Sequence, residues 1–163
     1  MENVNPLRQF VHYANRQPAW LGRWLMTRLF RHKVKLAGTC AIDILAANAN
    51  SVTFRQRNIT KVQNHIKGIH AAAMTLLAES ATGFITGINL PGDKLPLVKK
   101  MEINFVRRAS GDMTATAYLT DEQIAQMQTQ EKGEVTVRVE VKDAANEIPI
   151  ECHIVWAWIP KKR

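Results

Sequence analysis

The chain carries one acidic side chain, Glu79, inside the apolar segment AAAMTLLAE that begins at Ala71. Burying an ionised carboxylate costs several kcal/mol unless a partner compensates its charge. A carboxylate in such a place can act on a water molecule as a general base or attack a carbonyl carbon directly. It can also be a structural residue, satisfied by Thr75 one turn earlier or by a lysine of a partner chain. The residues alone leave both interpretations open.

His70 directly precedes this segment, so the main-chain N–H groups that follow it open the expected helix. These groups have no acceptor within the helix and lie at the positive end of its dipole. They are suited to bind an oxygen that gains negative charge, as a carbonyl oxygen does under nucleophilic attack. We expect the N–H of Ala71 to take this role, with the Asn64 amide as second donor or as the group that positions water. We expect His70 to orient the turn and not to act as a base.

The spacing of these groups predicts a shared site. Nine residues at about 100° each place Glu79 on the opposite side of the helix from His70 and about 13–14 Å further along it. One chain therefore cannot bring Ala71 and Glu79 to one carbonyl group. A two-fold dimer with neighbouring helices can, because each site then takes its helix start from one subunit and its carboxylate from the other.

The elements around the segment predict an α+β domain, built from an antiparallel sheet of about six strands around the long apolar helix. Apolar residues alternate with polar ones in the segments KVKLAGTCAIDIL, SVTFRQ, LPLVKKMEINFVRR, DMTATAYL, EVTVRVEVKD and EIPIECHIVWAWI. The turn between the first two strands is expected around 47–50, and a short helix near Asp121. We expect one domain over 1–163, with N-terminal helices over 5–32 and the core over 33–160.

Two amphipathic helices are expected before the sheet. Asn5-Pro6 is typical of a helix start, and the first helix should end before Pro18. The second carries Trp20, Leu21, Trp24, Leu25 and Leu29 on one side and arginines mostly on the other. Such a pattern fits a membrane-interface helix or a helix lying on a protein surface. We favour the protein surface and expect no membrane contact.

Composition and residue spacing argue against a secreted, a disulfide-bonded and a metal-binding protein. The N-terminal segment lacks the apolar stretch of a signal peptide, so we expect a cytoplasmic protein. Cys40 and Cys152 lie far apart without a C-x-x-C spacing, and we expect two reduced thiols. His65 and His70 are poorly spaced for one metal ion, and no metal or bound cofactor is expected. The net charge of +8 favours an anionic partner without identifying it.

The element order and the segment NHIKGIHAAAMTLLAE resemble the hot-dog fold acyl-CoA thioesterases of the phenylacetate-pathway and 4-hydroxybenzoyl-CoA type. That family has a motif similar to N-x-x-x-G-x-H-G-G before the helix and an acidic residue nine positions after the histidine. Asn64, Gly68, His70 and Glu79 occupy those positions. The resemblance implies thioester hydrolysis across a dimer interface, favours catalysis by Glu79, and is consistent with an uncharacterised branch. Coenzyme A is then part of the substrate, and the assembly is a homodimer or a dimer of dimers.

The chain departs from that pattern at two places. H-G-G is H-A-A here, and where many relatives have Ser or Thr after the helix the comparable positions are Val98 and Lys99. A non-catalytic acyl-ligand binding module of the same fold is therefore an alternative, and a basic nucleic-acid or membrane-surface interaction protein is a weaker one. The expected substrate-binding residues are Gly68, Thr75, Val98, Lys99, Lys100, Arg107 and Arg108, of which the basic ones suit the phosphates of coenzyme A.

Overall fold

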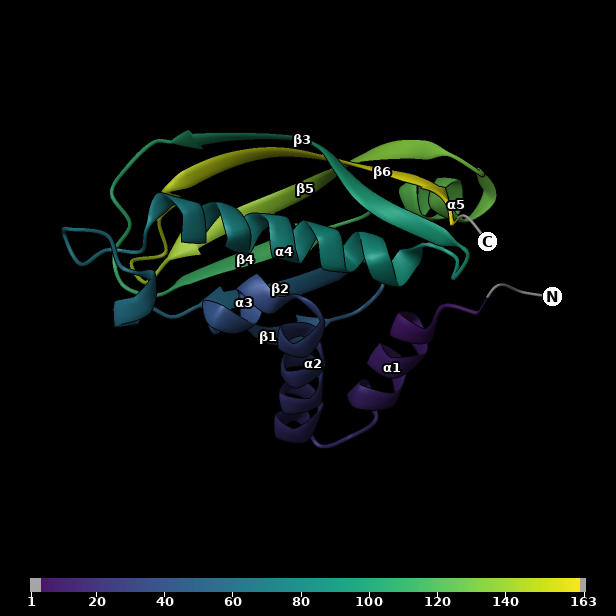
Figure 1. Ribbon diagram of the computed structural model, residues 1–163, viewed down its shortest axis with the longest axis horizontal. Coiled ribbons are helices and arrows are strands. Elements are labelled where there is room, and N and C mark those ends of the chain that lie inside the picture. Colours follow the sequence, from purple (N-terminus) through teal and green to yellow (C-terminus); the bar gives the residue numbers. More distant parts are fainter. Residues whose placement is uncertain (1–3, 162–163) are drawn as a thin grey trace.

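The computed structural model describes residues 4–161, which form one antiparallel sheet, one long helix against it and an N-terminal helical hairpin (Figure 1). The helices are α1 (Pro6–Asn15), α2 (Ala19–Lys33), α3 (Lys35–Thr39), α4 (Ala71–Asn89) and α5 (Asp121–Thr129), with a 3₁₀ turn at Thr60–Val62. The strands are β1 (Asp43–Ala47), β2 (Ser51–Gln56), β3 (Lys94–Phe105), β4 (Met113–Tyr118), β5 (Gly133–Asp143) and β6 (Ile150–Pro160).

The six strands lie in the order β1-β2-β4-β5-β6-β3, and every neighbouring pair is antiparallel. The sheet curves around α4, which runs along its inner side (Figure 1). This is the predicted α+β arrangement. Strands β1 and β3 form the two edges, and among the described residues β3 pairs only with β6.

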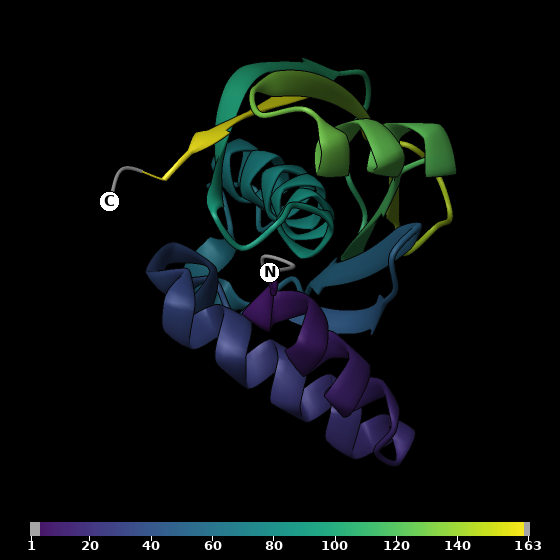
Figure 2. The same ribbon diagram turned by 90° about the vertical axis from the view of Figure 1, so that its right-hand side faces the viewer.

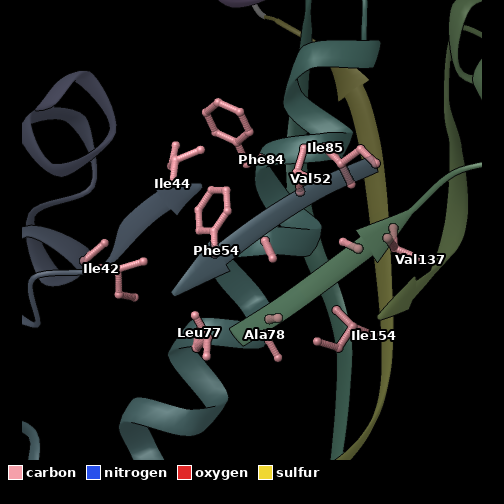
Figure 3. Close-up of a cluster of buried hydrophobic side chains, with 14 of the residues drawn as sticks. Ile42, Ile44, Val52, Phe54, Leu77, Ala78, Phe84, Ile85, Val137 and Ile154 are labelled. Atoms are coloured by element: carbon pink, nitrogen blue, oxygen red, sulfur yellow. The ribbon is translucent and has the colours of Figure 1, made fainter. Parts of the chain in front are cut away.

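Helix α4 is buried on most of its sides because the sheet wraps around it. By length and composition α4 could also cross a membrane, but most of it is buried within the protein. Leu77, Ala78 and Ile85 are fully buried against residues of β2, β5 and β6 (Figure 3). Phe84 extends this core toward the hairpin. Its ring centroid lies 5.4 Å from that of Phe54 and 5.7 Å from that of Phe30 of α2. The central helix therefore holds the sheet and the hairpin in one apolar core.

One predicted strand is wrong in its first half. The alternating segment from Val34 to Cys40 forms the short helix α3, and β1 begins only at Asp43. Helix α3 folds back closely on α2, because a Cβ on Gly38 would lie 2.7 Å from the carbonyl oxygen of Arg31. Glycine permits this close approach because it has no Cβ. The alternation of apolar and polar residues around Gly38 therefore does not mark a strand.

Helices α1 and α2 form a hairpin that extends away from the sheet (Figures 1 and 2). They cross closely where Gly22 meets the main chain of Ala14, since a Cβ on Gly22 would lie 2.4 Å from the Ala14 oxygen. The buried side of α2 consists of Gly22, Met26 and Phe30. Helix α2 therefore lies on the protein, as we favoured, but not through its tryptophans, since Trp20 is 73% and Trp24 is 53% exposed.

Helix α1 is attached to the C-terminal end of α4 by two polar side chains. Asn5 donates from Nδ2 to the Gly87 oxygen at 2.8 Å and also to the Leu90 oxygen. Arg8 donates from Nε to the Ile88 oxygen at 2.9 Å and from an Nη to the Asn89 oxygen at 3.2 Å. Carbonyl groups at the end of a helix accept no hydrogen bond from within the helix, and a cation is favoured at that end of the helix dipole. The attachment fixes where the hairpin sits.

We predict that Arg8→Ala lowers the free energy of unfolding by about 1–3 kcal/mol, because it leaves carbonyl groups at the end of α4 without a charged donor. Urea denaturation followed by circular dichroism measures the change. Arg23→Ala is the matched control, since Arg23 is exposed, and it should change stability by less than about 0.5 kcal/mol. Equal effects of the two substitutions would show that the attachment does not stabilise the fold.

Candidate active site

Glu79 is half-buried and lies in the wall of an apolar cavity of about 680 Å³. Helix α4 contributes Glu79, Ser80, Gly83, Phe84 and Gly87 to this wall. The hairpin and the strands close it with Asn5, Pro6, Leu7, Phe10, Leu29, Phe30, Lys33, Val34, Leu90, Pro91, Gly92, Lys94, Leu95, Pro96, Trp156 and Lys161. Cavities of this size and character are typical of small-molecule sites.

Close packing of Trp156 on α4 shapes the cavity beside Glu79. A Cβ on Gly83 would lie 2.6 Å from Cζ2 of Trp156, so the indole rests directly on the helix main chain. The indole Nε1 donates to the Thr82 hydroxyl at 2.9 Å, which holds the ring in this position. The tryptophan therefore presents a fixed apolar surface next to the carboxylate.

The Glu79 carboxylate has no hydrogen bond or ion pair of normal geometry with any residue in 4–161. Burial raises the pKa of Glu79 above 4.5, because the apolar surroundings disfavour the charged form. The adjacent Ser80 hydroxyl opposes this rise, although its oxygen forms no hydrogen bond of normal geometry in the described chain. Thr75 does not satisfy Glu79 either, since its hydroxyl donates to the Ala71 oxygen at 3.0 Å.

His70 caps the N-terminus of α4. Its Nδ1 accepts from the Ala72 N–H at 3.0 Å, so the neutral ring carries its proton on Nε2. The Ala73 and Met74 N–H groups donate to the His70 carbonyl oxygen at 2.9 and 3.0 Å. Within residues 4–161 the Ala71 N–H has no acceptor, and Ala71 itself is exposed. The helix start thus presents a free donor at the protein surface.

Asn64 shapes the loop before α4. Its Oδ1 accepts from the Ile66 N–H at 3.0 Å and from the Gly68 N–H at 3.1 Å. The positive φ in this loop belongs to Lys67, at 62°, and not to Gly68. No acceptor for Asn64 Nδ2 is found in the part of the chain that the structure describes. Gly68 is therefore a loop residue here, while the Asn64 amide retains a donor.

One chain does not bring the predicted catalytic groups together. The cavity that contains Glu79 is lined by none of Asn64, His70 or Ala71. Ala71 and Glu79 are both on α4, eight residues and therefore about 12 Å apart along its axis. Thr75 and Gly68 lie with the helix start, away from the cavity.

The predicted phosphate-binding residues lie on or just after β3, also outside the cavity wall. Lys99 pairs with Glu134, Lys100 with Glu102 at 3.0 Å, and Arg107 with Glu147 at 3.0 Å. Arg108 donates to the Ile66 oxygen at 3.4 Å, and Val98 is 42% exposed. The three ion pairs lie at the surface, where such pairs contribute little to stability.

Sequence reasoning missed the residues that the hairpin and the C-terminus bring to the cavity. Lys33 of α2 and Lys161 after β6 lie in its wall, as do Phe10 and Leu29. These positions are far from the motif in sequence, and only the docking of α1 on α4 brings them near Glu79. Arg8, a basic residue one turn after a helix cap, is the one local signal for that docking.

The thiols do not supply a nucleophile to this site. Cys40 and Cys152 are unpaired and half-buried, and burial raises the pKa of Cys152 to about 11. A thiol with such a pKa is protonated at neutral pH and is a poor nucleophile. Among residues 4–161 there is also no cluster of three His, Cys, Asp or Glu side chains suited to a metal ion.

Comparison with solved structures identifies the class of fold. A Pseudomonas aeruginosa protein of unknown function, described as a probable thioesterase, is similar over 89% of this chain and 97% of its own, with a TM-score of 0.76 and 24% identity. A Haemophilus influenzae thioesterase matches over 85% and 90% (TM-score 0.69, 14% identity), and one from Staphylococcus aureus over 78% and 100% (0.66, 19%). The fold is the hot-dog fold, as predicted.

The family is shown by sequence. Residues 22–159 match the family described as "Domain of unknown function (DUF4442)", and the chain belongs to this family. A search of curated protein sequences with this chain found no match. The fold and the family together confirm the prediction of a hot-dog protein from an uncharacterised branch.

We predict that Glu79→Gln makes the protein more stable than wild type at pH 8 and that the difference shrinks as the pH falls toward 4. Burial raises the pKa of Glu79 in the folded state, so an ionised carboxylate at pH 8 destabilises the folded wild-type protein relative to its unfolded chain. Glutamine is neutral at every pH and avoids this cost. Urea denaturation across this pH range tests it. A glutamine variant that is less stable than wild type at pH 8 would show that a cation or donor satisfies the carboxylate.

Proposed function

We propose that this protein hydrolyses an acyl thioester, with acyl-coenzyme A as substrate, at a site shared by two subunits. The observation that carries the proposal is the unpartnered, half-buried Glu79 carboxylate in the wall of a large apolar cavity. An apolar acyl chain is suited to such a cavity, because each methylene group buried there contributes about 0.8 kcal/mol to the binding free energy. With the acyl chain in the cavity, the thioester carbonyl group would lie near the Glu79 carboxylate in the cavity wall.

The reaction follows from the two groups. Glu79 removes a proton from water as the water oxygen bonds to the carbonyl carbon, and a raised pKa suits a base working near neutral pH. The carbonyl oxygen becomes an oxyanion that accepts hydrogen bonds from the partner's helix start, at the Ala71 N–H and the Asn64 amide. The carbon–sulfur bond then breaks, and the thiolate takes up the proton. Direct attack by Glu79, through an acid anhydride that water cleaves, uses the same groups.

A dimer through β3 supports this arrangement. Within residues 4–161 the outer edge of β3 has no partner strand, and β3 carries exposed apolar side chains, namely Leu95, Leu97, Val98, Met101 and Phe105. A long apolar edge strand invites pairing with another strand. Two-fold pairing of β3 with its own copy extends the sheet and sets two α4 helices side by side. We propose a homodimer of this form, with a dimer of dimers as an extension.

The spacing of Asn64 and Glu79 recurs in a solved structure of similar fold. The Staphylococcus aureus thioesterase has been solved with a Gln-to-Ala and, separately, with a Glu-to-Ala substitution, at positions fifteen residues apart. Asn64 and Glu79 have the same separation. We propose that the amide and the carboxylate act as a functional pair here.

The second candidate is an acyl-ligand binding module without turnover. It is favoured by Ala71 and Ala72, which stand where the resembling family has glycines and which are both exposed at the helix start. Their Cβ atoms narrow the approach of a thioester to the Ala71 N–H. The cavity and its carboxylate would then serve binding alone.

We predict that Glu79→Gln lowers thiol release from acyl-coenzyme A by at least about 100-fold, because general base catalysis contributes this much or more. A thiol-trapping assay over acyl chains of increasing length measures the rate. Glu131→Gln, at an exposed site beyond α5, is the control and should retain the wild-type rate. Equal rates for wild type and Glu79→Gln would refute the base assignment, and ligand binding by both without turnover would establish the binding module.

We predict that mixing Glu79→Gln with Asn64→Asp subunits restores activity that neither variant has alone. Aspartate keeps the Oδ1 acceptor that holds the loop and removes only the amide donor. Each heterodimer has one intact site of two, so statistical exchange should give about a quarter of the wild-type rate. No recovery after verified subunit exchange would show that both groups act within one chain.

A further inference from the structure

The tip of the α1–α2 hairpin is an exposed aromatic and basic surface. It comprises Arg16 in the turn and Trp20, Arg23, Trp24 and Arg28 on α2, which we call the tip surface. Trp20, Trp24 and Arg28 follow one another at four-residue spacing and share one side of the helix. Arg28 stacks on the ring of Trp24 at 5.5 Å. The turn between α1 and α2 lies far from the sheet, at the end of the projecting hairpin (Figures 1 and 2).

Nearly all of the protein's excess positive charge lies on this hairpin and α3. Residues 4–42 contain seven Lys and Arg and no Asp or Glu, whereas the remainder from Asp43 has fifteen basic and thirteen acidic residues. Arg8 and Arg31 are used internally, Arg8 on α4 and Arg31 on Asp43 at 2.6 Å. Arg16, Arg23, Arg28, Lys33 and Lys35 remain exposed. A surface of this charge repels a second copy of itself and attracts an anionic partner.

We propose that the tip surface docks the protein on anionic phospholipid membranes. Exposed tryptophan is suited to the interface between headgroups and acyl chains, where its ring is buried and its N–H remains hydrated. Arginines beside it bind the headgroup phosphates, and the negative surface potential of the membrane attracts them. A projecting hairpin can reach the interface without displacing the core. The proposal does not depend on thioester hydrolysis, since no residue of the tip surface lines the cavity.

Vesicle binding tests the proposal. Full-length protein is mixed with vesicles of phosphatidylcholine, with or without phosphatidylglycerol, and followed by co-sedimentation and tryptophan emission. Trp156 and Trp158 are buried, so a blue shift on binding reports Trp20 and Trp24. We expect binding and a blue shift with phosphatidylglycerol only, and loss of both when salt rises from about 0.1 M to about 1 M, because the screening length falls from about 10 to about 3 Å.

Variants assign the binding to the tip surface. Arg23→Gln with Arg28→Gln should weaken binding about 20-fold, and Trp20→Ala with Trp24→Ala at least about tenfold. Lys132→Gln with Arg138→Gln removes the same charge from exposed positions around β5 and should bind as wild type does. Thermal melts confirm that each variant is folded. Hydrolysis of a soluble thioester should be unchanged in all three.

Three outcomes would overturn the proposal. The first is equal binding by the tip variants and the control variant. The second is salt-sensitive binding to duplex DNA without binding to vesicles, which would assign the surface to nucleic acid. The third is a smaller sedimentation coefficient for Trp20→Ala with Trp24→Ala and no change in vesicle binding, which would assign it to contact between copies.

Discussion

The burial of one carboxylate, Glu79, beside an apolar cavity is the constraint on which the account depends. The carboxylate is half-buried, forms no ion pair within residues 4–161, and has its pKa raised by burial although the Ser80 hydroxyl opposes the rise. An isolated buried charge lowers stability, and sites that tolerate this cost are often functional. In the reaction that we propose, a thioester bound in the cavity next to it places its carbonyl carbon within reach of this carboxylate.

The hairpin links the fold to this site. Asn5 and Arg8 attach α1 to the end of α4, and the attachment brings Phe10 and Leu29 over the cavity. The same hairpin supplies the inner wall of the cavity at its base and the aromatic and basic surface at its tip. Under the two proposals made above, its base helps to enclose the acyl chain and its tip contacts the membrane.

The sequence predicted the sheet, the central helix and the cap at His70, because alternation and helix-start signals are local. It failed at α3, where a glycine contact with Arg31 outweighed alternation. It placed the second helix on the protein surface but did not show that Trp20 and Trp24 remain exposed, since an amphipathic pattern does not say which side of a helix meets protein. The motif singled out Glu79, whereas Lys33, Trp156 and Lys161 reach the cavity beside it only through tertiary packing. How the two halves of the site meet across subunits stays a prediction.

The most direct test of the shared site is a crystal structure of the assembled protein, with its oligomeric state verified in solution. The decisive measurement is the distance between the Ala71 nitrogen of one subunit and the Glu79 carboxylate of its partner. The account predicts that both groups face one thioester-sized cavity and lie closer than the about 12 Å that separates them along a single helix. A monomer in solution, or a dimer in which the partner's helix start faces away from Glu79, would contradict it.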